Sequence, residues 1–386
     1  MGREFSMTEK IESVAIIGCG QIGTSIAEAM ATQNSSLPIT IFDKNAQTES
    51  LVHQKFDQAS LSAARLYFAQ SIREAVQNAD LIIIATPMNV FESIAHDIAD
   101  YAKSTAIITD VGSAKKTSME HIRRGISNSS LRYVPAHPSR GNQGTGPLSA
   151  SATDILDKNS TMFLISAEGE SFTPQHGTAE HCVQDFWRSL GVTTTFITAE
   201  AHDNFFGQCS HFQHALAFAL MNSANTHPNI LDNFRHAGTG LRNLSRVAIC
   251  AQNNQHISPL AQMWMPVFDQ NQHPILASYS RFKKHLEIFL GFIERENYEG
   301  LKQKLDHAHQ FRQSFNDPEH REIFAGELAD IACIAFSPSP TPLSPFSTNV
   351  LLPYAIAYAQ LMSADELDPE FISKKANASF QDATHP

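Results

Sequence analysis

The sequence predicts an α/β domain built on a parallel sheet, followed by an all-helical domain, and three observations support this fold class. Short apolar runs alternate with helical stretches over residues 12–110, which is typical of parallel strands covered by helices on both faces. A glycine-rich turn, GCGQIG, connects the first apolar run to the first helical stretch. Strand-like runs cease near residue 199, and helical periodicity then dominates as far as about residue 330.

Each expected strand is a short apolar or β-branched run bounded by turn residues. In chain order these runs are SVAIIG, PITIFD, DLIIIATP, STAIITDVGS, TMFLIS and TTTFIT, the last two near residues 161–166 and 193–198. Helical spacing predicts helices at TSIAEAMATQ and around residues 70–78 and 90–103. Two long segments beyond residue 199 have the same periodicity: NFFGQCSHFQHALAFALMNSA and SRFKKHLEIFLGFIERENYEGLKQKLDHAHQFRQSF.

Three segments are expected, at residues 12–198, 199–330 and 331–386. The last begins with the Pro/Ser-rich stretch FSPSPTPLSPFS, which is typical of a linker or an extended loop. The helical stretch LLPYAIAYAQLM follows it and resembles a degraded copy of the segment that starts at SHFQH. Such a copy would complete a core rather than form a second site. The alternative is two unrelated alanine-rich helices.

Composition narrows the classes of partner. The chain has 386 residues, 42% of them apolar, and a formal net charge of −11. This acidic balance argues against binding to nucleic acid or to an anionic membrane surface. The five cysteines are scattered and lack CxxC spacing, which favours reduced thiols in a cytoplasm. No apolar run is long enough to span a bilayer. We therefore expect a small-molecule partner and no membrane contact.

The glycine turn predicts a Rossmann-type dinucleotide-binding domain. Gly18 permits the tight turn, Gly20 lets the backbone approach a pyrophosphate, and Gly23 allows close packing of helix on strand. The phosphates would lie at the helix N-terminus, where free amides favour negative charge. The other residues expected to contact the cofactor are Gln21 and Ile22 in the turn, and Thr86 and Pro87 where the third strand ends.

Asp43 ends the second strand, where a carboxylate would accept hydrogen bonds from the ribose hydroxyls and repel a 2′-phosphate. The sequence therefore favours NAD over NADP, although the neighbouring Lys44 acts against this preference. The alternatives are a purely structural glycine turn and a methyltransferase that binds a different adenosine ligand.

Four further polar motifs could carry chemistry. TDVGSAKK places Ser113 just past a strand end, where it could instead cap the following helix. HPSRG supplies His137, which Pro138 should hold in an extended loop as the chain leaves a strand. SHFQH places His211 and His214 on one helix face, as pocket residues, as ordinary half-buried histidines or as two ligands of a metal. No carboxylate or cysteine is spaced to complete a metal set, so no metal is expected.

The last motif, LRNLSR, supplies Arg246, whose alternative role is a surface ion pair. Taken together, GCGQIG, DVGSAK, HPSRG, SHFQH and SR resemble, in order and spacing, the motifs of the prephenate/arogenate dehydrogenase family. The resemblance covers about residues 12–330. It implies a Rossmann-type domain followed by an all-helical dimerisation and substrate domain, and hence a homodimer.

The resemblance also implies a reaction: prephenate, a dicarboxylate, is oxidised by NAD⁺ and decarboxylated to 4-hydroxyphenylpyruvate in tyrosine biosynthesis. His137 would be the base for the substrate hydroxyl, because imidazole has a suitable pKa. Ser113 would bind that hydroxyl and orient the imidazole. Arg246 would bind the ring carboxylate bidentately, and His214 and His211 would line the pocket.

Two departures from the family pattern bear on the substrate. Arg140 adds a cation after HP, where the family has small or apolar residues, and SHFQH lacks the usual proline. Arogenate or an amino-substituted prephenate analogue is therefore an alternative substrate. A non-catalytic NAD-binding regulatory protein of the same fold is another alternative, as is a β-hydroxyacid dehydrogenase, which would use a lysine on the helical domain.

Overall fold

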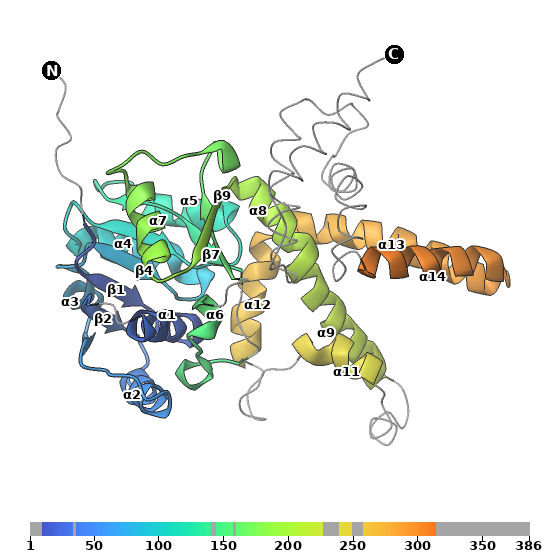
Figure 1. Ribbon diagram of the computed structural model, residues 1–386, viewed down its shortest axis with the longest axis horizontal. Coiled ribbons are helices and arrows are strands. Elements are labelled where there is room, and N and C mark those ends of the chain that lie inside the picture. The colour runs from blue at the N-terminus through green and yellow to red at the C-terminus, as the bar shows by residue number, and fades with distance from the viewer. Residues whose placement is uncertain are drawn as a thin grey trace, which may run out of the picture. The chain divides into compact units, whose positions relative to one another are not determined.

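The fold is given by a computed structural model (Figure 1), which describes residues 10–33, 36–139, 144–156, 160–226, 239–248 and 258–313. The segment predicted at 331–386, with its linker and degenerate repeat, lies outside these residues. Among the described helices, none has the length and apolar character needed to cross a membrane.

The main sheet has six parallel strands. They are β1 (Val14–Ile17), β2 (Ile39–Phe42), β3 (Leu66–Phe68), β4 (Leu81–Ile84), β5 (Ile107–Asp110) and β6 (Arg132–Tyr133). Their spatial order is β3-β2-β1-β4-β5-β6, so the strand order reverses between β1 and β4. In open α/β sheets, ligands bind at such a switch point, outside the carboxyl ends of the strands.

Helices cover this sheet because its central strands are apolar on both faces. Every residue of β1, β4 and β5 is buried. The associated helical elements are α1 (Gln21–Thr32), α2 (Thr48–Gln58), α3 (Ile72–Val76), η1 (Met88–Val90), α4 (Phe91–Tyr101) and α5 (Lys116–Gly125). The predicted strands and helices of this region are confirmed. β3, α2 and α5 were not predicted, because their sequences are short or largely polar.

A second, three-stranded sheet continues the chain. It contains β7 (Ala136–Pro138), β8 (Thr161–Ile165) and β9 (Thr193–Ile197), with β7 antiparallel to β8 and β8 parallel to β9. Around it lie η2 (Pro147–Ser149), α6 (Thr153–Leu156), η3 (Gly169–Ser171) and α7 (Ala179–Ser189). His137 was expected in a loop, but it belongs to β7 and pairs with Phe163. Pro138 favours an extended backbone at His137, and in the structure this extended segment pairs with β8.

Every described element beyond Ile197 is helical, which confirms the predicted fold class of an α/β region followed by an all-helical one. These elements are α8 (Ala199–Phe206), η4 (Gly207–His211), α9 (Phe212–Asn225), α11 (Thr239–Ser245), η5 (Arg246–Ala248), α12 (Ser258–Gln270), α13 (Gln272–Glu294) and α14 (Tyr298–Gln313). η4 is a single π-helical turn, a feature often found at functional sites. Its Gly207 packs so closely on Pro274 that a Cβ there would lie 2.4 Å from the proline Cβ.

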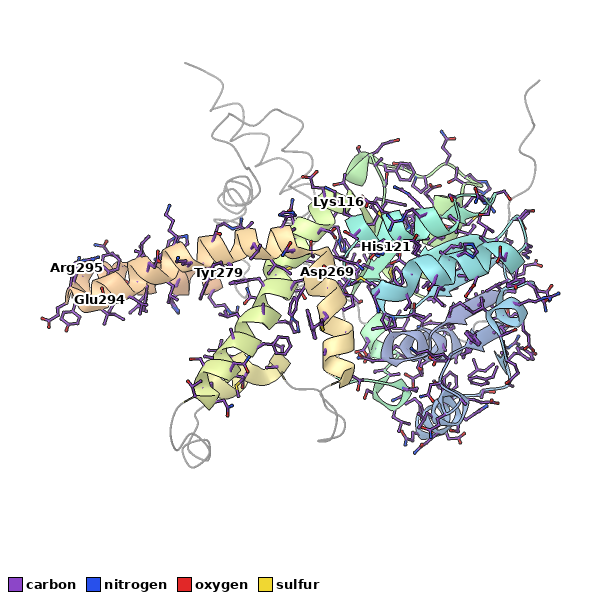
Figure 2. The ribbon with its side chains drawn as sticks, turned by 180° about the vertical axis from the view of Figure 1, so that it is seen from behind. Lys116, His121, Asp269, Tyr279, Glu294 and Arg295 are labelled. Atoms are coloured by element: carbon purple, nitrogen blue, oxygen red, sulfur yellow. The ribbon has the colours of Figure 1, made fainter. Side chains whose placement is uncertain are left out.

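The chain divides into two compact units, and the boundary between them falls within α13. Both sheets and the helices through α12 belong to the first unit, which ends at Ile275; the second comprises residues 168–172 and the chain from Leu276. Figure 2 labels Tyr279 and Glu294 in α13 and Arg295 directly after it. The prediction of a single long helical run in this region is wrong in one respect. The chain breaks between α13 and α14, where Glu296 has a φ of 52°.

Candidate active site

The glycine turn, residues 18–23, leads from β1 into α1 at the switch point of the main sheet. Gly18 has a φ of +89°, a conformation that L side chains rarely adopt. A Cβ on Gly23 would lie 2.1 Å from the Gly18 carbonyl oxygen, whereas a Cβ on Gly20 would meet no atom within 4 Å. Gly18 and Gly23 therefore shape the turn, and the open space at Gly20 leaves room for a ligand to approach the backbone.

Two polar side chains adjoin the turn. One Asp43 carboxylate oxygen accepts a hydrogen bond from the Cys19 backbone N–H at 2.8 Å, so the end of β2 is tied to the turn. Thr86 packs against Gly18, and its Oγ1 is buried without a hydrogen-bond partner among the described residues. A buried hydroxyl without a partner is costly, so this atom favours a polar ligand at the turn.

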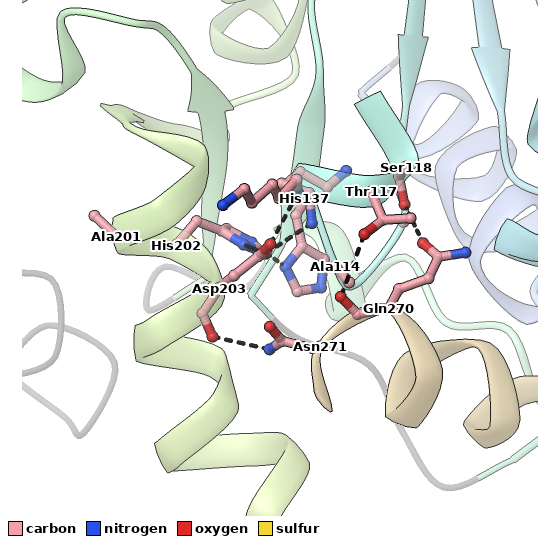
Figure 3. Close-up of polar contacts among 12 residues, drawn as sticks. Ala114, Thr117, Ser118, His137, Ala201, His202, Asp203, Gln270 and Asn271 are labelled. Atoms are coloured by element: carbon pink, nitrogen blue, oxygen red, sulfur yellow. Dashed lines mark hydrogen bonds and ion pairs between the residues drawn. The ribbon is translucent and has the colours of Figure 1, made fainter. Parts of the chain in front are cut away.

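A second group of polar side chains, here called the histidine cluster, comprises His137, His202, Asp203, His211 and Asn271. His137 Nδ1 lies 2.8 Å from His202 Nε2, and His202 Nδ1 lies 2.9 Å from Asp203 Oδ1 (Figure 3). All five residues are buried, with His137 the most exposed at 7%. His137 Nε2 makes no hydrogen bond to a described residue. It is therefore the ring nitrogen available to a ligand.

Asp203 also caps a distant helix. Its Oδ1 accepts a hydrogen bond from the Lys115 backbone N–H at 2.7 Å, and its Oδ2 accepts one from Lys116 N–H at 2.8 Å. These amides start α5, where the helix dipole favours a negative charge. Ser113, which was considered as the cap of this helix, does not fill that role. The cap comes from a residue far along the chain instead.

A buried lysine fixes the backbone beside His137. Lys115 Nζ donates to Asp110 Oδ2 at 2.5 Å and to the Ala136 carbonyl oxygen at 2.7 Å. Tyr133 donates from its hydroxyl to the other Asp110 oxygen at 2.7 Å. Because Ala136 directly precedes His137, this network ties the end of β5 to the strand that carries the imidazole.

Burial controls the protonation of the cluster. Desolvation lowers the pKa of His137 well below its usual value, and electrostatic interactions with His202, Lys115 and His211 lower it further. Burial also lowers the pKa of His202, although the hydrogen bond to Asp203 opposes this. Burial by itself would raise the pKa of Asp203, but hydrogen bonds from His202 and two backbone amides hold it below its usual value. The result is an ionised Asp203 beside neutral imidazoles at neutral pH.

The helical region contributes two more histidines. His211 lies in η4, and Asn271 Nδ2 is 2.8 Å from its Nδ1. Burial lowers the His211 pKa to about 3. His214 Nδ1 donates to the Ser210 carbonyl oxygen at 2.9 Å, and its ring lies over Trp264 with centroids 3.9 Å apart. His211 thus belongs to the histidine cluster, whereas His214 packs on the Trp264 ring.

Two family models match the chain. Residues 44–193 match the nucleotide-binding domain of prephenate dehydrogenase, and residues 198–307 match its dimerization domain. The chain belongs to the prephenate dehydrogenase family. The matched range begins just after the glycine turn and Asp43, so the role of the turn rests on its own geometry.

Relatives within the prephenate dehydrogenase family have low identity to this chain. A prephenate dehydrogenase of Lactococcus lactis is 24% identical over 82% of this chain and 80% of its own length. A cyclohexadienyl dehydrogenase of Zymomonas mobilis is 26% identical over 61% and 75%. Among solved structures, a prephenate dehydrogenase from A. aeolicus superposes with a TM-score of 0.63 at 24% identity, over 81% of this chain and 99% of that one. These relatives are dehydrogenases, and the structural likeness supports the fold.

Not all of the site residues predicted from the family pattern fall within the described part of the chain. Ser113 lies two residues before Lys115 and is half-buried, but it makes no hydrogen bond to His137. The imidazole is oriented by His202 instead. Arg246 begins η5, and Arg140 lies outside the described residues. Within the described part of the chain, no group of three or more His, Cys, Asp or Glu side chains could hold a metal ion.

Sequence reasoning missed His202, Asp203 and Asn271. His202 and Asp203 occur in the stretch TAEAHDN, which looks like an ordinary helix start with Thr198 as its cap. An adjacent His–Asp pair just past a cap is a weak local signal for a buried cluster. Asn271 lies between two helices and has no local signal at all.

Proposed function

We propose that the protein oxidises and decarboxylates prephenate to 4-hydroxyphenylpyruvate, with NAD⁺ as the hydride acceptor. The observation that carries this proposal is the environment of His137. It is a buried imidazole held neutral, with one ring nitrogen available, in a chain of the prephenate dehydrogenase family. Its strand follows β6 at the edge of the nucleotide-binding sheet.

The glycine turn fits a dinucleotide. Gly20 leaves room for a pyrophosphate, and the N-terminus of α1 has no side-chain cap and favours an anion. The Thr86 hydroxyl, which has no partner among the described residues, offers a donor. Gln21, Ile22 and Pro87 would complete the contacts, and Asp43 would bind the ribose hydroxyls. The bound cofactor would supply the hydride acceptor. We assign NAD rather than NADP because a carboxylate at the end of β2 repels a 2′-phosphate.

His137 would act as the general base. Its neutral Nε2 can accept the proton of the substrate hydroxyl while hydride leaves the carbon that bears it. Loss of carbon dioxide then returns an electron pair to the ring, which becomes aromatic, and the phenolic oxygen takes a proton back. Ser113 would donate a hydrogen bond to the same hydroxyl. General-base catalysis of this kind contributes about 10²–10⁴-fold to the rate.

The substrate carboxylates need cations or hydrogen-bond donors. Arg246 would bind the ring carboxylate, because a guanidinium pairs with a carboxylate through two parallel hydrogen bonds. His214 and His211 would line the pocket, His211 as a neutral group because burial lowers its pKa to about 3. Arg140 would lie near the side chain of the substrate and influence its selection.

Arogenate is a second candidate substrate. A cyclohexadienyl dehydrogenase is among the relatives, and Arg140 departs from the family pattern after HP. The deciding experiment follows NAD⁺ reduction with prephenate and arogenate in parallel. We expect a higher kcat/KM with prephenate. A clear preference for arogenate would reassign the substrate, and no NADH with either would favour a non-catalytic NAD-binding protein.

We also propose a homodimer formed through the helical region. The matched dimerization domain spans residues 198–307, and α13 exposes large apolar side chains such as Tyr279 at 49% and Ile293 at 49%. Burying such side chains against a second copy would remove apolar surface from water. Light scattering on the eluting peak of a size-exclusion column tests this. A mass of one chain would contradict it.

A further inference from the structure

Two hydrogen-bond chains start from a single residue of the histidine cluster and end on two different histidines. The Asp203 carboxylate leads through His202 to His137, with distances of 2.9 and 2.8 Å. The Asp203 backbone carbonyl leads through Asn271 to His211, with both distances 2.8 Å. Figure 3 shows Asp203 between His202 and Asn271. Each chain fixes the protons of the ring at its end.

The direction of the first chain follows from its carboxylate. An ionised Asp203 can only accept, so His202 must carry its proton on Nδ1. His202 is neutral, so its Nε2 has a lone pair and accepts a hydrogen bond from His137 Nδ1–H. A neutral His137 then has no proton on Nε2. The ring nitrogen available for the substrate is therefore the one with the lone pair.

The second chain gives the opposite result. A backbone carbonyl only accepts, so the Asn271 atom that contacts it is the amide nitrogen, a donor. The same nitrogen donates its second hydrogen to His211 Nδ1. His211, also neutral, must carry its proton on Nε2. The two histidines thus differ in tautomer, although they belong to the same cluster.

We propose that His202 is a positioning residue, which together with Asp203 holds His137 in the tautomer whose Nε2 can accept the substrate proton. This inference rests on the proposed role of His137 as the base. When His137 has taken the proton, its Nδ1–H still faces a lone pair backed by a carboxylate. The positive charge that forms on the ring is therefore stabilised without any rearrangement.

Aromatic side chains surround these two hydrogen-bonded imidazoles. The Phe206 ring packs on His137 and His202, with centroid distances of 4.4 and 4.5 Å. Phe163 lies against His202 at 6.2 Å. The charged or titratable groups that influence the two imidazoles are Lys115, Asp110, Asp203 and His211. Within the described part of the chain, the linked nitrogens of His137 and His202 make no other hydrogen bond that could reverse the direction of these links.

The test compares two substitutions at one position. His202→Gln can still donate an amide N–H to Asp203 and accept from His137 through its oxygen, so it preserves the direction of the chain. His202→Leu cannot do either. By analogy with the outer partners of metal-bound histidines, we expect His202→Leu to lower kcat about ten- to a hundredfold, with little change in KM. His202→Gln should recover most of that loss.

A second readout does not depend on catalysis. Nuclear magnetic resonance of the chain with isotope-labelled histidine distinguishes a ring nitrogen that carries hydrogen from one that does not. The His137 signals are assigned as those lost in His137→Asn. We expect hydrogen on Nδ1 of His137 in the wild type and in His202→Gln, and a mixture of tautomers in His202→Leu. Phe206→Leu, which removes ring packing and no hydrogen bond, should leave the tautomer unchanged.

The outcomes separate this inference from the proposed function. Hydrogen on Nε2 of His137 in the wild type would overturn the inference. An unchanged tautomer and unchanged kcat in His202→Leu would also overturn it. If the tautomers are as expected but neither prephenate nor arogenate is oxidised, the proposed function fails and the assignment of His202 stands.

Discussion

The glycine turn and the histidine cluster are both candidate binding regions of the first compact unit, and they are built in opposite ways. The turn is a run of consecutive residues that works through its backbone and through a missing side chain at Gly20. The cluster joins residues from β7, α8, η4 and the junction between α12 and α13, and it works through buried polar side chains. A site made of backbone is therefore local in sequence, whereas a site made of buried side chains depends on the whole unit.

The largest expected effect concerns the cluster. His137→Asn keeps similar bulk and some hydrogen bonding, but it cannot accept a proton at neutral pH. We expect kcat to fall about 10²–10⁴-fold, because that is what a general base typically contributes. Steady-state kinetics measure this, and titration with NAD⁺ should show unchanged affinity because the turn is untouched. Loss of folding, or more than about a tenth of wild-type kcat, would remove His137 from the mechanism.

The next effect concerns the turn, where two glycines should respond differently. Gly23→Ala places a Cβ 2.1 Å from a backbone oxygen and should destabilise the fold by about 1–3 kcal/mol. Gly20→Ala meets no protein atom, so it should leave stability unchanged and weaken NAD⁺ binding. Thermal unfolding and NAD⁺ titration of both variants check this. Equal NAD⁺ affinity in Gly20→Ala and wild type would show that the ligand does not approach there.

The third effect is on the pH dependence and again separates the two regions. A base must be neutral, so kcat/KM falls as pH drops through the pKa of His137. Because burial lowers that pKa below its usual value of 6.5, kcat/KM at pH 5.5 should remain a larger fraction of its plateau than an ordinary histidine would allow. An ordinary histidine of pKa 6.5 would leave about a tenth of it. Gly20→Ala should show the same acid limb as wild type. A midpoint at or above 6.5 would contradict the burial of the base.

The smallest effect concerns the choice of cofactor at the turn. Asp43→Asn keeps the size of the side chain and an acceptor for the Cys19 N–H, but it removes the negative charge. One charge pair near the surface is worth about 1 kcal/mol or more, so the ratio of kcat/KM with NADP⁺ to that with NAD⁺ should rise about fivefold. Kinetics with both cofactors measure the ratio. A wild type that already prefers NADP⁺ would mean that a cation such as Lys44 outweighs Asp43.

Local patterns predicted much of the fold. The strands around the glycine turn are continuous apolar runs, and such runs have few alternatives to buried parallel strands. The predictions failed where the sequence was locally ambiguous. The polar start of α5 depends on a cap from Asp203, and the break before α14 depends on a single residue, Glu296, with positive φ. Neither feature has a strong local signature.

By itself, the sequence determined the parallel sheet, the glycine turn and the extended backbone at His137, because apolar periodicity, glycine and proline act over a few neighbouring residues. Only the tertiary structure decided which group orients His137, which tautomer it holds and how far its pKa falls. These properties depend on burial and on contacts between residues as distant as 137 and 202, which no short segment encodes. Ser113 lies nearer to His137 in the chain, yet the fold places His202 against the imidazole.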